Sequence, residues 1–249
     1  APMSLVAGRL SVQAGAHHME IHQGGNGTLL GGVPGVAPGK VLILGGGVVG
    51  SSAIRVALGM GADVTVLDRS VNRLGELDEQ YRGQLRTVYS TAEALEEHVR
   101  EADLIIGAVL IPGASAPKLI TAEMLADAKP GTVMVDVAID QGGCFETSRA
   151  TTHADPTYVV DGVVHYCVAN MPGAAARTAT VALTNATLPY VTRLASDDVG
   201  SLLLEDRHFA AGLNIMHGQL THRAVADALG QTWTEPDHIL RTSLHLKSA

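Results

Sequence analysis

KVLILGGGVVGSSAIRVALGMGADVTVLD, residues 40–68, decides the fold of this chain. Four consecutive apolar residues at 41–44 are typical of a parallel strand that is buried on both faces. Glycines with G-x-G-x-x-G spacing follow, and after them come an apolar helical segment and a second apolar run that ends on Asp68. The pattern predicts a strand, a glycine turn, a helix and a strand, which is the unit that binds dinucleotides.

Each glycine of the pattern has a distinct expected role. Gly45 permits the tight turn, Gly47 lets the backbone approach a pyrophosphate, and Gly50 lets the helix pack closely on the sheet. Asp68 follows Gly45 by 23 residues, where a carboxylate can accept hydrogen bonds from ribose hydroxyls. Its charge favours NAD over NADP, although Arg69 beside it leaves some use of NADP open. The alternative is a glycine turn with a purely structural role.

Composition limits the class of protein. The 249 residues fit one large domain, or one domain with part of another, and they are 46% hydrophobic but only 3% aromatic. A net charge of -8 without a dense Lys/Arg run argues against a nucleic-acid partner. Two cysteines, Cys144 and Cys167, are too few for a disulfide scaffold and favour a cytoplasmic protein. We expect no membrane partner, because no apolar stretch of about twenty residues occurs.

Beyond Asp68, predicted strands alternate with predicted helices. The strands are expected at 85–88, 103–110, 132–138, 158–160 and 163–168. The helices are expected at 72–81, 91–99 and 121–128, after an opening helix that Ser4 caps and that runs to about Ile21. This alternation predicts an α/β fold with a doubly wound parallel sheet, the Rossmann fold.

The pattern changes near residue 178, after which helices dominate. We expect helical segments at 180–194, 209–212, 217–229 and 237–240. The predicted domains are therefore a dinucleotide-binding domain with its leading helix at 1–174, and C-terminal helices at 175–249.

Asp140 is the candidate acid/base residue. It follows the strand predicted at 132–138 and precedes Gln141, Gly142 and Gly143. Loops after parallel strands are where such a sheet binds ligands, so a carboxylate there can serve proton transfer. The residues alone leave open a second reading, in which Asp140 caps a helix or satisfies the backbone of its loop.

Three motifs give a family resemblance. The segments 140–146, 167–172 (CVANMP) and 182–187 (ALTNAT) resemble those of bacterial L-alanine dehydrogenases, and the resemblance spans nearly the whole chain, to about Pro236. The related transhydrogenase subunit shares 107–110, 117–120 and a Gln-Gly-Gly turn, but lacks the Asn-Met-Pro and Leu-Thr-Asn-Ala-Thr segments.

The resemblance implies reversible oxidative deamination of L-alanine to pyruvate and ammonia, with NAD as cofactor. It also implies that Asp140 transfers protons beside the substrate and that complete members form homohexamers. The residues that it places around the cofactor are Ser4, Gly45, Gly47, Val48, Val49, Gly50, Asp68, Arg73, Ser90, Val109, Leu110, Val137, Ala138, Ile139, Asp140, Arg149, Val168, Ala169, Asn170 and Met171.

The resemblance also bears on what this chain does alone. In the family, the catalytic domain combines an N-terminal segment with the C-terminal helices, and the NAD domain is inserted between them. The arginine, lysine and histidine that the N-terminal segment supplies have no counterpart here. We therefore expect the cofactor-binding part of an alanine dehydrogenase, inactive on its own. The alternative is an NAD(H)-binding module without catalysis, either transhydrogenase-like or regulatory.

We expect no metal site. His18 and His22 could share a helix face, but no third ligand is near, so an ordinary helix surface is the favoured interpretation. Some family members bind magnesium through an acid and a histidine, and Arg193 and Asp197 stand at the corresponding positions here. Cys144 lies beside Asp140 without a basic partner, so we interpret it as a buried thiol.

Overall fold

The computed structural model describes residues 1–109, 116–196 and 198–247. The chain divides into two compact units, Ala1–Leu183 and Thr184–Ala249. The division falls within the long helix α6 (Ala176–Ser196). The domain boundary after residue 174 remains a prediction.

A seven-stranded sheet forms the centre of the first unit, and its strand order is β3-β2-β1-β4-β5-β7-β6. Every neighbouring pair is parallel except β6 with β7. The strands are β1 (Lys40–Leu44), β2 (Asp63–Asp68), β3 (Leu85–Tyr89), β4 (Leu104–Gly107), β5 (Val133–Asp136), β6 (Thr157–Val160) and β7 (Val163–Tyr166). The α/β fold class is thus confirmed, and the strand order reverses between β1 and β4, where such sheets bind ligands.

One edge strand, β6, departs from the predicted parallel sheet because it pairs antiparallel with β7. β6 and β7 form a hairpin whose two connecting residues, Asp161 and Gly162, have φ angles of 49° and 79°. Two residues with positive φ make the turn that suits a β-hairpin, whereas a parallel connection needs a dozen residues or more. The short Asp-Gly connection therefore determines the direction of β6.

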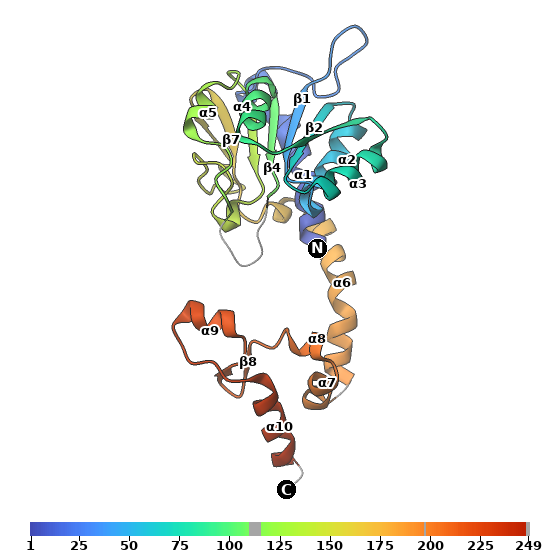
Figure 1. Ribbon diagram of the computed structural model, residues 1–249, viewed down its shortest axis with the longest axis vertical. Helices are drawn as coiled ribbons and strands as arrows, with labels where there is room; N and C mark the ends of the chain where they lie inside the picture. Colours follow the sequence, from blue (N-terminus) through green and yellow to red (C-terminus); the bar gives the residue numbers. More distant parts are fainter. Residues whose placement is uncertain (110–115, 197, 248–249) are drawn as a thin grey trace. The chain divides into compact units, whose positions relative to one another are not determined.

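Helices cover both faces of the sheet (Figure 1). One face packs against α1 (Pro2–His18), α2 (Val48–Gly59) and α3 (Val71–Tyr81), and the other against α4 (Ala92–Glu101) and α5 (Ala122–Ala126). Within β1 the side chains alternate between the two cores: Val41 and Ile43 belong to the first, Leu42 and Leu44 to the second. Both cores consist mainly of aliphatic side chains, as the composition predicts.

Helix starts follow the expected capping chemistry in most places. The hydroxyls of Thr91 and Thr121 accept hydrogen bonds from the backbone N–H groups three residues later. The prediction that Ser4 caps the opening helix is wrong, because α1 already begins at Pro2. A proline is well suited to the first helical turn, where its missing N–H costs no hydrogen bond.

The second unit contains short helices and one small hairpin. Its elements after α6 are α7 (Val199–Glu205), α8 (Arg207–Ala210), β8 (Ile215–Met216), β9 (Gln219–Leu220), α9 (Arg223–Leu229) and α10 (Pro236–Lys247). The helix predicted at 217–229 is wrong in its first part, because His217 and Gly218 adopt positive φ and turn the chain from β8 into β9. Among the described residues, no helix is long and apolar enough to cross a membrane.

The contact between α1 and α2 gives a stability prediction. A Cβ on Gly8 would lie 2.2 Å from the carbonyl oxygen of Val49, so Gly8→Ala should destabilise the fold by about 1–3 kcal/mol through overpacking. The matched control is Gly75→Ala in α3, where no described atom lies within 4 Å of the added Cβ. That substitution should stabilise the protein by about 0.5–1 kcal/mol. Urea unfolding of both variants measures the difference, and equal stabilities would contradict the close packing.

Candidate dinucleotide and catalytic site

The glycine turn joins β1 to α2 with very little space between them. Gly45 has a φ of +95°, a conformation that side-chain-bearing residues rarely adopt. A Cβ on Gly50 would lie 1.8 Å from the carbonyl oxygen of Gly45, so only glycine permits this approach of helix and turn. Both predicted roles therefore match the geometry of the turn.

The amino end of α2 is suited to bind an anion. Gly47 is its N-cap residue, and none of the described side chains caps the helix or places an acid in its first turn. The first N–H groups of a helix carry partial positive charge and need acceptors. A pyrophosphate supplies such acceptors, and no described atom lies within 4 Å of a Cβ built on Gly47, which leaves room for its approach.

Asp68 ends β2 directly beside this turn. Its Oδ2 atom accepts a hydrogen bond of 2.7 Å from the N–H of Gly46, and its Oδ1 atom accepts one of 2.8 Å from the N–H of Ser70. A carboxylate oxygen can accept more than one hydrogen bond, so both atoms keep capacity for ribose hydroxyls. The carboxylate is thereby oriented before any cofactor binds.

Arg73 binds the carbonyl group of the same residue, Gly46. Its Nε donates to the carbonyl oxygen of Gly46 at 2.7 Å, and a terminal nitrogen donates to Ser51 Oγ at 2.6 Å. Ser51 Oγ in turn lies 2.9 Å from the carbonyl oxygen of Gly46. Arg73 thus braces the turn, and its direct contact with the cofactor remains a prediction.

A cleft of about 320 Å³ opens beside the glycine turn. This volume lies at the lower end of the range for small-molecule sites. The cleft is lined by Leu44, Gly45, Gly47, Leu67, Asp68, Arg69, Ser90, Val109, Pro117 and Leu119. Ser90 and Val109 were predicted to contact the cofactor, and they lie here with Asp68. Leu110, also predicted, lies outside the described residues.

Asp140 lies at the same edge of the sheet, beyond the end of β5. It is exposed in the short helix η2 (Ile139–Gln141), and its Oδ1 atom accepts a hydrogen bond of 3.3 Å from the N–H of Asn170. Asn170 has a φ of +51° and leads into η3 (Met171–Ala175). Two segments that lie thirty residues apart in the sequence, and that the family resemblance assigns to one pocket, are therefore in contact.

The other residues predicted to contact the cofactor differ in how deeply they are buried. Val49, Gly50, Ala138, Ile139, Val168 and Met171 are buried, Val137 is half-buried, and Val48 and Ala169 are exposed. Arg149 lies over the ring of Tyr158, with its guanidinium carbon 3.9 Å from the ring centre. Ser4 lies one helical turn before Gly8, which meets the first turn of α2.

Asp136, which sequence reasoning missed, organises the Asp140 loop. Its fully buried carboxylate accepts hydrogen bonds from the N–H groups of Ala138 (3.0 Å) and Cys144 (2.9 Å) and from Ser148 Oγ (2.5 Å). Asp136 thus satisfies the loop backbone, the role that the alternative reading gave to Asp140. The sequence shows only that Asp136 is an acid inside the apolar run 133–139, and it does not reveal the partners that give the carboxylate this role.

Cys144 is a neutral thiol in this arrangement. Burial, and then the charge of Asp136, raise the pKa of the Cys144 thiol well above its ordinary value. A thiol must ionise to act as a nucleophile, so the interpretation of Cys144 as a buried structural residue agrees with its surroundings.

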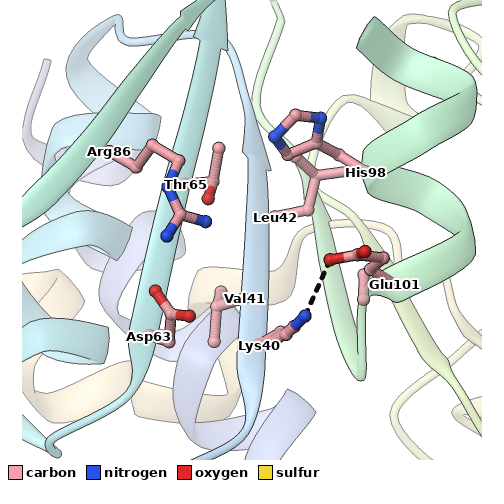
Figure 2. A pocket seen from close by; sticks show the side chains of 9 residues that line it. Lys40, Val41, Leu42, Asp63, Thr65, Arg86, His98 and Glu101 are labelled. Carbon is pink, nitrogen blue, oxygen red and sulfur yellow. Dashed lines mark hydrogen bonds and ion pairs between the residues drawn. The ribbon is translucent and has the colours of Figure 1, made fainter.

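A second hollow lies at the opposite, amino edge of the strands (Figure 2). It measures about 20 Å³, which is room for one water molecule. Lys40 and Glu101 form an ion pair of 2.7 Å there, and this pair raises the pKa of Lys40. The hollow is too small for a dinucleotide and lies away from the glycine turn.

The histidines at 18 and 22 do not share a helix face. α1 ends at His18, which is buried, and burial lowers the pKa of its imidazole. His22 lies in the separate helix η1 (Ile21–Gln23) and faces Glu20 at 3.1 Å. Of the other pair considered for a metal, Arg193 is bound to Asp206 at 3.1 Å, and Asp197 lies outside the described residues.

The glycine turn, the amino end of α2 without a side-chain cap and the acid that ends β2 define a dinucleotide-binding α/β domain. The profile of the family described as "Alanine dehydrogenase/PNT, C-terminal domain" matches residues 11–223, and the chain belongs to this family. Family membership together with Asp68 identifies NAD as the cofactor. The glycine turn and the cleft beside it are the parts of this chain that fit it.

Curated relatives agree with this assignment. The chain is 68% identical over 235 residues to an alanine dehydrogenase of Halomonas elongata, covering 94% of this chain and 63% of the relative. It is 53% identical over 240 residues to the alanine dehydrogenase of Mycolicibacterium smegmatis, covering 96% of this chain and 65% of the relative. The chain thus spans less than two thirds of the length of these relatives.

Solved structures of related proteins superpose on this chain. An L-alanine dehydrogenase superposes with a TM-score of 0.89 at 52% identity, covering 92% of this chain and 63% of that chain. A transhydrogenase from Sinorhizobium meliloti superposes with a TM-score of 0.73 at 26% identity, covering 88% of this chain and 62% of the transhydrogenase chain.

The buried carboxylate of Asp136 gives a second stability prediction. In Asp136→Asn, the amide nitrogen cannot accept a hydrogen bond, so one N–H of Ala138 or Cys144 loses its partner. The variant loses a hydrogen bond to a charged group and leaves the donor buried without a partner. We therefore expect its free energy of unfolding to fall by about 3 kcal/mol. Asp78→Asn, on the exposed surface of α3, is the control and should change stability by less than about 0.5 kcal/mol. Equal free energies of unfolding for the two variants would contradict this role.

Proposed function

We propose that this chain is the cofactor-binding part of an NAD-dependent alanine dehydrogenase. The reaction converts L-alanine, NAD and water into pyruvate, ammonia, NADH and a proton, and it is reversible. The family assignment supports the class of enzyme. The observation that carries the proposal is the contact of Asp140 with Asn170 at the sheet edge that also holds the glycine turn.

Asp140 is well placed to move protons. Bound NAD would accept the hydride from the α-carbon of alanine, which leaves an iminium group. Asp140 then takes a proton from the water that adds to the iminium carbon and returns it to the nitrogen. The nitrogen leaves as ammonia, and the hydroxyl that the water supplied becomes the keto oxygen as its proton passes to solvent. One carboxylate can perform both transfers, because it is a base in the first step and an acid in the second.

The surroundings of Asp140 suit this role. Its side chain is exposed, so a substrate can reach it. The N–H of Asn170 binds Oδ1, and the second carboxylate oxygen can take part in proton transfer. Gly142 follows without a side chain, and no described atom lies within 4 Å of a Cβ built on it.

The groups that bind alanine itself form a further part of the proposal. We propose that the arginine, lysine and histidine expected from the family come from a segment outside this chain, and that the complete enzyme is a cytoplasmic homo-oligomer, a homohexamer. The chain alone should bind NAD and oxidise alanine very slowly, because positioning contributes about 7–11 kcal/mol to catalysis.

A binding module without its own chemistry is the second candidate. The observation in its favour is the likeness to the Sinorhizobium transhydrogenase, at 26% identity over most of the chain. Such a module would bind NAD(H) through the same turn, but Asp140 would have no role in turnover.

Cofactor selection gives the first functional prediction. Asp68→Ala should weaken NADH binding by about 1.5–3 kcal/mol, the range for hydrogen bonds to charged groups. Asp63→Ala, at the other end of β2, is the matched control and should leave the affinity unchanged. Calorimetric titration measures both variants, and the unsubstituted chain should bind NADH more tightly than NADPH. Equal affinity for the two cofactors would refute the role of Asp68.

The test of the proposed reaction uses the chain completed with the N-terminal segment of its Halomonas relative. Asp140→Asn keeps the size of the side chain but removes its basicity, so kcat should fall by about 10²–10⁴ while NADH affinity changes little. Glu146→Gln is the control, because this carboxylate on the same loop accepts a hydrogen bond from the N–H of Ala122 at 2.7 Å. It should keep normal turnover.

The opposite pattern would make Asp140 a structural residue. In that case Asp140→Asn would lose NADH binding and thermal stability, while turnover per bound cofactor stayed normal. A completed enzyme that binds NADH but does not oxidise alanine would instead favour the binding module.

A further inference from the structure

Lys118 reaches from the edge of the cofactor cleft to the loop that carries Asp140. Its Nζ atom donates hydrogen bonds to the carbonyl oxygens of Gly142 (2.5 Å), Gly143 (3.0 Å) and Phe145 (3.1 Å). An ammonium group has three N–H donors, so all three are accounted for by the backbone of this one turn.

The turn after Asp140 is shaped so that its carbonyls converge on one point. Gly142 and Gly143 have φ angles of +89° and +75°, and consecutive left-handed residues curve the chain tightly. On the other side of the same turn, the N–H of Cys144 points to the buried carboxylate of Asp136. The turn is therefore held between an ammonium that binds three of its carbonyl groups and a carboxylate that accepts a hydrogen bond from its Cys144 N–H.

The backbone around Lys118 is joined to the same loop. The N–H of Ala116 donates to the carbonyl oxygen of Gln141 at 3.0 Å, and the N–H of Leu119 donates to that of Cys144 at 2.7 Å. The neighbours of Lys118 in the sequence, Pro117 and Leu119, line the cleft that contains Asp68. The segment thus contacts both the cofactor cleft and the turn that follows Asp140.

Stabilising the fold is the simpler role for such a lysine, but it accounts poorly for this geometry. Lys118 is exposed as a residue and makes its three hydrogen bonds to one loop only, so these bonds fix the loop and not the fold as a whole. The ammonium determines the position of three carbonyl groups in the turn that follows Asp140. A misplacement of about 1 Å at a reacting group can cost about 10²-fold in rate, so local geometry here matters more for turnover than for stability.

We propose that Lys118 is a positioning residue for proton transfer by Asp140. Its ammonium holds the turn 141–145 in place. The Asp140 carboxylate therefore keeps its contact with Asn170 at the edge of the sheet that also carries the cofactor cleft. The inference rests on the proposed function, because it assigns Lys118 an effect on a reaction that Asp140 performs.

The test compares Lys118→Met with Lys129→Met in the completed enzyme. Lys129 also binds backbone, because its Nζ donates to the carbonyl oxygen of Glu101 at 2.6 Å and to Asp103 at 3.1 Å, but at the amino edge of the sheet. Lys118→Met should lower kcat about 10- to 100-fold with NADH affinity nearly unchanged, whereas Lys129→Met should keep kcat. Lys118→Arg, which retains charge and donors, should recover most of the lost rate.

A second measurement does not depend on turnover. Hydrogen exchange of the 249-residue chain without cofactor should be faster at residues 140–146 in Lys118→Met and unchanged there in Lys129→Met. Normal kcat in Lys118→Met would overturn the inference, as would unchanged exchange, or equal losses of kcat, NADH affinity and thermal stability.

The two proposals fail in different ways. If the unsubstituted completed enzyme does not oxidise alanine, the proposed function fails, and hydrogen exchange alone decides whether Lys118 holds the turn. If Lys118→Met lowers kcat while Asp140→Asn does not, the role of Asp140 fails, and the positioning role of Lys118 fails with it.

Discussion

Parallel pairing on both sides of β1 is the constraint on which the site depends. Leu44 is in register with Leu67 of β2 and with Gly107 of β4, and Gly107 is in register with Asp136 of β5. Because parallel strands end at the same edge, the glycine turn, Asp68 and the Asp140 loop all lie at one edge of the sheet. A shift of register in any of these strands would separate the cofactor cleft from the candidate acid/base residue.

Two carboxylates close together in the sequence have different environments and therefore different roles. Asp136 is fully buried and accepts backbone and hydroxyl hydrogen bonds from its own loop. Asp140 is exposed and accepts a hydrogen bond from Asn170, which belongs to another segment. A buried carboxylate with satisfied oxygens is suited to hold a loop, whereas an exposed one at the edge of a ligand site is suited to exchange protons. Asp136 thus holds the loop on which Asp140 lies.

Sequence reasoning predicted the parts of the structure that depend on local pattern. Apolar runs and glycine spacing identified β1, α2 and β2, because burial on two faces and a tight turn leave a strong signal. It failed for the hairpin at Asp161 and for the turn at Gly218, where a two-residue connection outweighs the pattern of the flanking residues. Asp136 and Lys118 could not be found in this way, since their partners are backbone groups brought near by the tertiary fold. The role of Asp140 came from the family resemblance.

The most direct test of this account is an NADH titration of the isotopically labelled chain followed by NMR. One continuous site at the carboxyl edge predicts chemical-shift changes at the amides of residues 45–50, at the Asp140 loop and at Asn170. The amides around Lys40 and Glu101, at the amino edge, should not change. Shift changes confined to the glycine turn, with none at Asp140 or Asn170, would contradict the claim that the cofactor and the candidate acid/base residue share one site.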